Sequence, residues 1–131
     1  MRRWAKDHPH EYALIYGSPI PGYSAPQDTV VPASRVPLVL VSLLHESWTA
    51  GTLTVHDDAL PSTVGAQATQ LAAAIAPDLP AAVLTRAVLA WTQLFGMISF
   101  ELFGQFVGSF DPTDAFFEHA IEQAVEYVGL H

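Results

Sequence analysis

The segment from Pro80 to about Val107 constrains the fold most, because it is apolar around most of the circumference of a helix. Its polar residues lie in narrow stripes: Thr85, Arg86, Thr92, Gln93 and Ser99 at heptad spacing, then Glu101 and Gln105. At about 1.5 Å per residue, such a helix would be about 40 Å long. A helix that is apolar on most sides must be buried on more than one side. We therefore expect one side to face the domain's own core and another side to face a second chain.

The overall composition supports the same expectation. The chain has 131 residues, half of them hydrophobic and 14% charged, whereas soluble domains have roughly 25% charged residues. This length predicts a single domain over residues 1–131. A core this small cannot hide so much apolar surface. We therefore expect a second chain to cover some of this apolar surface.

The charge balance argues against nucleic-acid binding by this chain. Five Lys and Arg residues stand against thirteen Asp and Glu residues, which gives a formal net charge of −8. Neutralising phosphates requires clustered cations. The small cluster of Arg2, Arg3 and Lys6 is more typical of a solvated chain end. We expect no direct binding of DNA or RNA.

The sequence gives no sign of a membrane or secretory segment. The strongest apolar run, Ala87 to Phe100, is shorter than the roughly 18–20 residues of a membrane span, and Glu101 ends it. The amino-terminal residues lack the apolar stretch of a signal peptide. The chain has no cysteine, so disulfides and thiolate sites are excluded. We expect a cytoplasmic protein.

The apolar periodicity and the Pro and Gly punctuation predict an all-α fold. The expected helices are residues 1–6, 9–16, 34–50, 62–76, 80–107 and 112–129. The expected helix starts are the N-caps Ser34, Asp78 and Asp111, with Pro37 and Pro112 in the following first turns. The expected helix ends are Gly51 and Gly129. The stretch from Gly17 to Val31 is either a passive connector or a cover over a site.

Metal and nucleophile chemistry have little support in the sequence. His45 and Glu46 are adjacent and so point to different sides of a helix, and His119 precedes Glu122 in the reverse of the di-iron order. Ser109 lacks the second glycine of a nucleophile elbow. We expect no metal, no cofactor and no catalytic residue. Glu101 lies in the most apolar helix. If it is buried, it needs a partner or an abnormal pKa; otherwise it lies on a solvated edge or at a helix–helix seam.

The aromatic residues are a stronger signal. Trp48, Trp91 and Phe95 are accompanied by a few polar neighbours, including His45 and Thr92. Large aromatics beside a few polar groups are typical of a small-molecule pocket between helices. The alternative is ordinary core packing.

Several segments together resemble a known domain. They are Arg3-Trp4-Ala5, His8-Pro9, Glu11 to Leu14, Tyr16-Gly17, Pro19, Pro32-Ala33, Arg35-Val36, Ala90-Trp91-Thr92, Phe95-Gly96, Ser99 to Gly104, Phe116 and Gly129-Leu130. The chain resembles the C-terminal regulatory domain of TetR-type transcriptional repressors, in the subgroup called the WHG domain. The Trp and His-Pro opening is fairly specific when it occurs with the later Phe-Gly and Glu-Leu-Phe-Gly stretch.

The resemblance implies a helical bundle of about five to six helices that binds a small apolar or aromatic effector and dimerises. In this family the last two long helices usually build a four-helix interface between subunits, here residues 80–107 and 112–129. The implied interface residues are Phe100, Phe103, Gly104, Phe117, Ile121 and Ala124. The implied pocket residues are Tyr12, Tyr16, His45, Trp48, Trp91, Thr92 and Phe95.

Repressors of this family begin with a basic helix-turn-helix that binds operator DNA, and this sequence does not contain one. The chain is therefore a fragment of a longer repressor, a mis-started reading frame or a stand-alone sensor. In each case this polypeptide alone should not bind an operator. Two other functions stay open: a stand-alone small-molecule-binding protein or enzyme on a helical bundle, and an interaction protein without a pocket.

Overall fold

The computed structural model describes residues 1–17, 21–22 and 30–131, and this part of the chain contains helices and no strand. The helices are α1 (Arg2–Asp7), α2 (Pro9–Tyr16), α3 (Val30–Thr49), α4 (Ser62–Ile75), α5 (Ala81–Leu102) and α6 (Asp114–Val128). The expectation of an all-α fold is confirmed.

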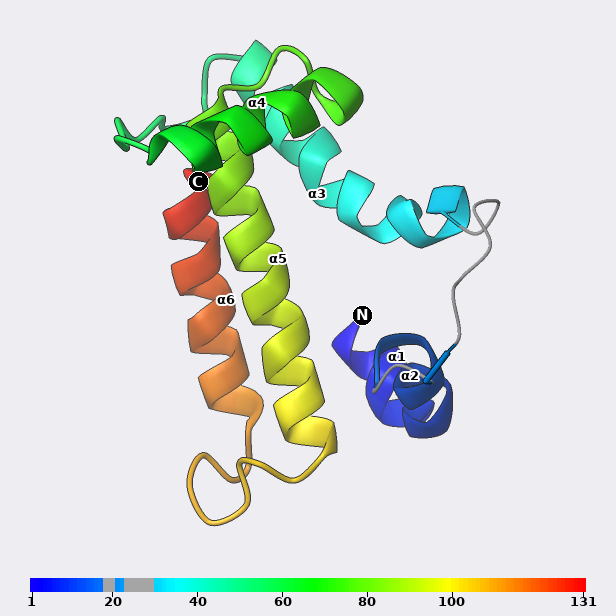
Figure 1. The fold of residues 1–131 in the computed structure, drawn as a ribbon. Coiled ribbons are helices and arrows are strands. Elements are labelled where there is room, and N and C mark those ends of the chain that lie inside the picture. Colours follow the sequence, from blue (N-terminus) through cyan, green and yellow to red (C-terminus); the bar gives the residue numbers. More distant parts are fainter. Residues whose placement is uncertain (18–20, 23–29) are drawn as a thin grey trace.

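The antiparallel pair of α5 and α6 sets the frame of the molecule. α5 and α6 lie side by side and antiparallel, and α4 crosses one end of the pair (Figure 1). α3 starts away from the pair and reaches it at the end where α4 lies. α1 and α2 pack beside the other half of α5. The long α5 therefore contacts every other layer of the fold.

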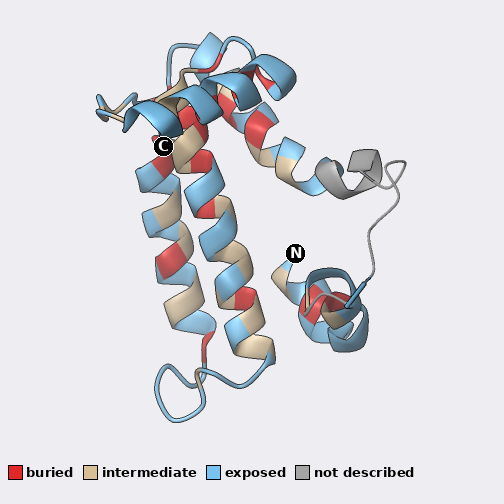
Figure 2. Cartoon of the chain, in the orientation of Figure 1, coloured by how far each residue is buried: buried red, intermediate tan, exposed pale blue. Residues whose placement is uncertain are grey.

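The core consists of two clusters along α5. The larger cluster joins α3, α4, α5 and the end of α6: Val41, Leu44, Leu53, Ala72, Ala76, Leu79, Val83, Leu84, Ala87, Ala90 and Val128. The smaller one holds α1 and α2 against α5: Ala5, Tyr12 and Ile98. Much of the remaining surface of α5 and α6 is exposed (Figure 2).

α5 ends at Leu102, earlier than the predicted end at about Val107, and residues 103–110 form turns and bends. Gly104 and Gly108 have φ of 77° and 80°. A positive φ is incompatible with continuing an α-helix, and glycine adopts it at little cost. The prediction that the helix continues to about Val107, and so includes Gly104, was wrong. At the other end, Pro80 and not Asp78 is the N-cap.

α6 begins two residues later than predicted. Its N-cap is Thr113, not Asp111, and Pro112 lies before the helix. Thr113 is buried, and its hydroxyl donates a hydrogen bond to the carbonyl of Phe110 at 3.2 Å. This contact ties the helix start to the preceding turns. The sequence pattern of caps could not choose between Asp111 and Thr113, because both residue types are favoured N-caps.

α3 begins earlier than predicted, at Val30, so Ser34 lies inside the helix and is not its N-cap. Pro32 falls in the first turn, where a missing N–H costs nothing. Pro37, expected in the first turn, lies inside the helix. The predicted connector 17–31 falls largely on residues 18–20 and 23–29, which lie outside the described part of the chain.

The predicted end of α6 is confirmed at Gly129, which has φ of 87°. A Cβ at this position would lie 2.1 Å from the carbonyl oxygen of Thr54. The amide of Thr54 in turn donates to the carbonyl of Gly129 at 2.9 Å. The end of α6 is thereby fixed to the loop after α3, and only glycine fits there.

α5 has the length and mean hydropathy of a membrane-spanning helix when it is judged by length and composition only. In the fold, its residues Val83, Leu84, Ala87, Ala90 and Ile98 are buried against other helices. Arg86 and Glu101, near its two ends, are both ion-paired. We therefore interpret α5 as the central helix of a helical domain.

Candidate functional site

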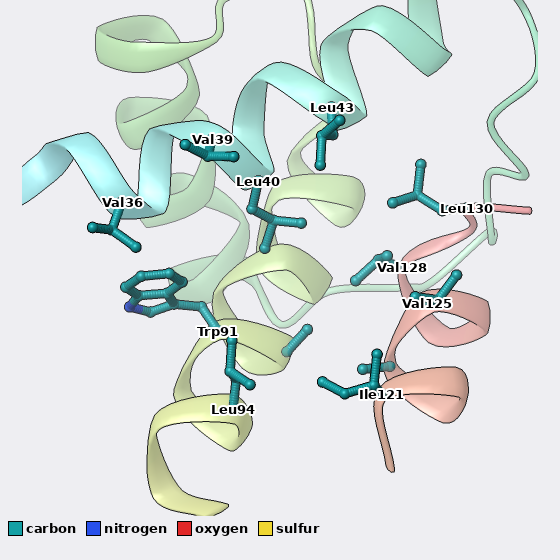
Figure 3. A pocket seen from close by; sticks show the side chains of 12 residues that line it. Val36, Val39, Leu40, Leu43, Trp91, Leu94, Ile121, Val125, Val128 and Leu130 are labelled. Carbon is teal, nitrogen blue, oxygen red and sulfur yellow. The ribbon is translucent and has the colours of Figure 1, made fainter. Parts of the chain in front are cut away.

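An apolar cavity of about 320 Å³ lies between α3, α5 and α6. Figure 3 shows side chains from the three helices around it, with Trp91 of α5 next to Val36 and Leu40 of α3, and Leu94 of α5 on the side toward Ile121 of α6. The cavity is lined by Val36, Val39, Leu40, Leu43, Ala90, Trp91, Leu94, Ile121, Ala124, Val125, Val128 and Leu130. Its size is at the lower end of the range of about 300–1,000 Å³ typical of ligand sites.

The chemistry of this cavity follows from its lining. Every lining side chain is aliphatic except Trp91, whose indole N–H is the one side-chain polar group on the wall. Burying a charged or strongly polar ligand group there would cost several kcal/mol, on the order of 2–7 kcal/mol for an unpaired polar group. The cavity is therefore suited to hydrocarbon and unsuited to acid–base chemistry.

A row of aromatic rings leads from the small core cluster to this cavity. The ring centroids of Tyr12 and Tyr16 are 5.2 Å apart, those of Tyr16 and Phe95 are 4.6 Å apart, and those of Phe95 and Trp91 are 4.4 Å apart. Such separations are typical of favourable aromatic pairs. The row connects α2 to the face of α5 that lines the cavity.

Tyr12 is fully buried and holds α2 against α5. Its hydroxyl lies 2.7 Å from the Ser99 hydroxyl and donates to the Phe95 carbonyl at 3.3 Å. Because these contacts satisfy the phenol inside the protein, Tyr12 has a structural role in this conformation.

Of the seven residues predicted for the pocket, Trp91 lines the cavity and Tyr16 and Phe95 stand next to it in the aromatic row. The other predicted residues lie elsewhere. His45 lines a separate hollow between α3 and α4, and Trp48 is 37% exposed near the end of α3. Thr92 is exposed, and its hydroxyl donates to the Leu89 carbonyl at 2.8 Å.

The sequence reasoning missed the aliphatic wall that makes up most of the cavity. The predicted pocket residues are aromatic or polar, whereas the residues that α3 and α6 contribute to the cavity are mainly valine, leucine and isoleucine. Two signals could have found them. They are the Val-rich run from Val36 to Val41 and the apolar stripe that α6 turns toward α3.

The residues predicted for a dimer interface divide into two groups. Phe117 packs on the small core cluster, and Ile121 and Ala124 line the cavity within the same chain. Phe100 and Phe103 are each more than half exposed, and Gly104 is exposed in the turn after α5. The structure therefore points the α6 stripe inward and leaves the end of α5 outward.

A second hollow, of about 450 Å³, lies on another face of the α5–α6 pair. We call it the outer groove, and it is lined by Gln93, Gly96, Met97, Phe100, Phe106, Phe116, His119, Ala120 and Gln123. None of these residues is Asp, Glu, Lys or Arg. A Cβ built at Gly96 would have no other atom within 4 Å, so the groove floor is open there.

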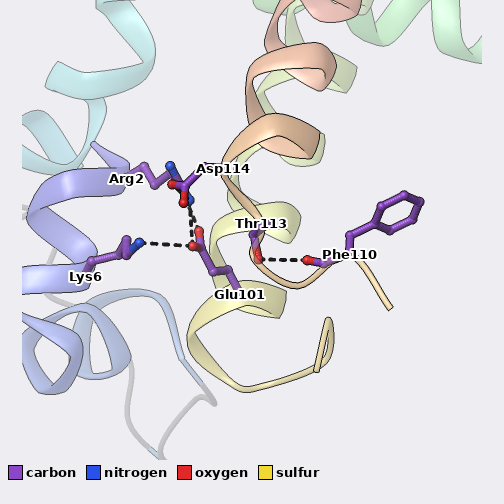
Figure 4. Close-up of polar contacts among 6 residues, drawn as sticks. All are labelled: Arg2, Lys6, Glu101, Phe110, Thr113 and Asp114. Carbon is purple, nitrogen blue, oxygen red and sulfur yellow. Dashed lines mark hydrogen bonds and ion pairs between the residues drawn. The ribbon is translucent and has the colours of Figure 1, made fainter. Parts of the chain in front are cut away.

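An ionic network joins α1 to the adjacent ends of α5 and α6 (Figure 4). Arg2 donates two hydrogen bonds of 2.7 Å to the two carboxylate oxygens of Glu101 and one of 2.8 Å to Asp114. Lys6 lies 3.4 Å from Glu101. The guanidinium of Arg2 also lies 4.6 Å from the centroid of the Phe117 ring.

The network shifts the ionisation of its acids. The hydrogen bonds from Arg2 lower the pKa of Glu101 against the opposing effect of partial burial, and they lower the pKa of Asp114 as well. The pKa of Arg2 is raised by the same contact with Glu101. Glu101 therefore has ionic partners in Arg2 and Lys6 at its place near the end of α5.

A second ion pair holds the loop before α4 to the other end of α5. Arg86 donates to both carboxylate oxygens of Asp58 and, at 2.7 Å, to the Tyr127 carbonyl of α6. This contact lowers the pKa of Asp58. The described residues contain no group of three or more His, Asp or Glu side chains placed to hold a metal ion.

Comparisons with known proteins identify relatives of this fold. Residues 1–124 match the model of the family described as tetracyclin repressor-like, C-terminal domain. HTH-type transcriptional regulators from Mycobacterium bovis and Mycobacterium tuberculosis are 33% identical to the chain over 107 residues. The matched stretch is 81% of this chain and 46% of each regulator. The chain spans about half the length of these relatives.

Proposed function

The chain belongs to the family of tetracyclin repressor-like C-terminal domains, and from this premise we propose that it senses a small apolar effector and pairs with a second copy of itself. The family consists of regulator domains and not of enzymes. In the complete regulator, these two activities would control operator binding in the cytoplasm.

The cavity between α3, α5 and α6 is the single observation that carries the sensing proposal. It is walled by three different helices, so a ligand inside it would contact all three at once. Filling it would add contacts that an empty apolar cavity lacks, at about 25 cal/mol for each Å² of apolar surface removed from water. A ligand would therefore favour the arrangement of α3 against the α5–α6 pair that fits it best.

The outer groove supports the dimerisation proposal. A chain with a net charge of −8 repels its own copy over most of its surface. The outer groove has no formally charged lining residue, and the exposed Phe100 lies within it. Such a face can be self-complementary about a two-fold axis, with Gly96 allowing the partner helix to come close. We place the interface here, and not on the inward stripe of Phe117, Ile121 and Ala124.

The ionic network offers a route from the cavity to the amino-terminal helix. α6 lines the cavity with Ile121 and Val125 and presents Asp114 to Arg2 at its other end. A shift of α6 on effector binding would move its contact with α1. In a regulator with a DNA-reading head before α1, this shift would change the separation of two heads in the dimer. Independence of effector and operator binding in the full-length regulator would contradict this coupling.

The sensing proposal is tested by calorimetric titration with naphthalene, a compact neutral apolar probe. We expect saturable binding with one site per chain. Val39→Phe places a ring at the wall of the cavity, and we expect it to weaken binding at least tenfold. Val107→Phe is the matched control, because Val107 is 75% exposed and lies outside the cavity. Absence of saturable binding, or equal weakening by both substitutions, would overturn the proposal.

A further inference from the structure

A second apolar cavity, of about 260 Å³, lies on the other side of α3 from the first. It is bounded by α3, α4 and α5, and its lining residues are Pro37, Leu38, Leu40, Val41, Leu71, Ile75, Leu84, Ala87, Val88 and Trp91. No charged, hydroxyl or amide side chain lines it. Its wall therefore has the same chemistry as that of the first cavity.

The two cavities share two wall residues, Leu40 of α3 and Trp91 of α5. Leu40 and Trp91 therefore stand between the two cavities, where α3 passes over α5, and we call the place between these two side chains the neck. An α-helix with its side chains is about 10 Å across. A molecule that occupied both cavities would have to be longer than this width and thin enough to pass the neck.

The shape and the chemistry together restrict the ligand. A charged head group has no partner on either wall, so it would have to stay in solvent. A fused ring system that filled the first cavity would have to push α3 away from α5 to reach the second. An unbranched chain of methylenes needs neither a polar partner nor a wide neck.

We propose that the effector is a neutral, elongated aliphatic molecule, of the class of fatty alcohols and fatty acyl esters, whose chain passes between Leu40 and Trp91 and occupies both cavities. This inference rests on the proposed sensing function and specifies the class of its ligand. It also assigns Leu40 and Trp91 as the residues that set the length and width of what binds.

The first test is a homologous series of 1-butanol, 1-hexanol, 1-octanol and 1-decanol, titrated into the protein by calorimetry. Each methylene that enters an apolar cavity should tighten binding about fourfold. We expect this increase to continue to 1-decanol, because the longer chains reach past the neck. A rise that stops at 1-hexanol would overturn the proposal, because the longer chains would then gain no contact with the second cavity.

The second test uses a matched pair of substitutions. Val39 lines the first cavity and Val88 lines the second, and both are more than a third exposed, so phenylalanine can be accommodated at the rim of each. We expect Val39→Phe and Val88→Phe each to weaken binding of 1-decanol at least tenfold. Binding of naphthalene should respond to Val39→Phe and not to Val88→Phe.

The outcomes separate the two proposals. If neither naphthalene nor any alcohol binds, the sensing function itself fails. If Val39→Phe weakens binding of naphthalene while Val88→Phe leaves binding of 1-decanol unchanged, the sensing function stands and the proposed class of elongated ligands is wrong. Circular dichroism of each variant identifies unfolding, and Val88→Ala, which enlarges the second cavity without blocking it, should retain binding of 1-decanol.

Discussion

Arg2 and Glu101 are 99 positions apart in the sequence and form a two-pronged ion pair that joins the first helix of the described fold to the end of its longest one. Their side chains are 18% and 13% exposed. The pair is therefore partly shielded from water. Removing either partner would leave the other charge without compensation and destabilise the fold.

Replacing Arg2 should destabilise the fold. Arg2→Ala leaves Glu101 with Lys6 as its remaining cation, at 3.4 Å, and removes the stacking on Phe117. We expect a loss of about 1–2 kcal/mol in the free energy of unfolding, measured by urea denaturation. Arg3→Ala, at an exposed site of the same helix, should stay within about 0.5 kcal/mol of the wild type. Equal losses in the two variants would contradict the importance of the pair.

The same pair predicts a pH dependence. Arg2 lowers the pKa of folded Glu101 below its ordinary value of 4.5, so the unfolded chain binds more protons in this range. The stabilisation is complete above about pH 4.5 and is lost as the pH falls through the lowered folded value. Urea unfolding at a series of pH values should show the advantage of wild type over Glu101→Gln shrinking below pH 4.5. An advantage that stays constant down to pH 3 would rule this linkage out.

The outer groove predicts a specific loss of dimerisation. Phe100→Asp adds a negative charge to each copy at a groove without formal charge, and symmetry places the substitution in the interface twice. We expect the dimer dissociation constant to rise at least tenfold, or about 1.4 kcal/mol, in sedimentation equilibrium. Val107→Asp adds the same charge outside the groove and should have little effect. A dimer that survives Phe100→Asp would place the interface on another face.

Two glycines with positive φ give a matched test of close packing. Gly129→Ala brings a Cβ to within 2.1 Å of the Thr54 carbonyl, whereas Gly51→Ala meets no atom within 4 Å. Both substitutions incur the cost of a left-handed conformation, about 1–2 kcal/mol. Only Gly129→Ala must also displace the loop, so we expect its melting temperature to fall clearly further. Equal decreases in melting temperature would show that the loop at Thr54 moves away from the added Cβ without loss of stability.

The helical class and most helix positions could be predicted from local sequence, because apolar periodicity and Pro or Gly punctuation act within one helix. The exact ends of α5 and α6 could not. The apolar pattern predicts a helix to about Val107, whereas α5 ends at Leu102 and Gly104 has a positive φ just beyond it. Asp111 and Thr113 are both favoured N-caps by residue type. The hydrogen bond from Thr113 to the Phe110 carbonyl and the ion pair of Arg2 with Asp114 fix where the helix begins.

The candidate site was only partly predictable for a related reason. Sequence periodicity shows that α6 has an apolar stripe, but it does not show whether Ile121 and Ala124 face α3 or a second chain. That choice depends on where α3 lies, and long-range packing sets its position. The aromatic pattern included Trp91, which lines the cavity, whereas the aliphatic wall carries no distinctive residue type.

The wall of the cavity between α3, α5 and α6 contains almost nothing that can recognise the direction or identity of a functional group. Such a surface distinguishes molecules by volume, and one methylene more or less changes affinity by only about 1–3 kcal/mol. A sensor built on this cavity, as proposed, would measure the combined concentration of many similar lipophilic compounds. Its output would follow the abundance of a chemical class, and no single metabolite would be required to trigger it.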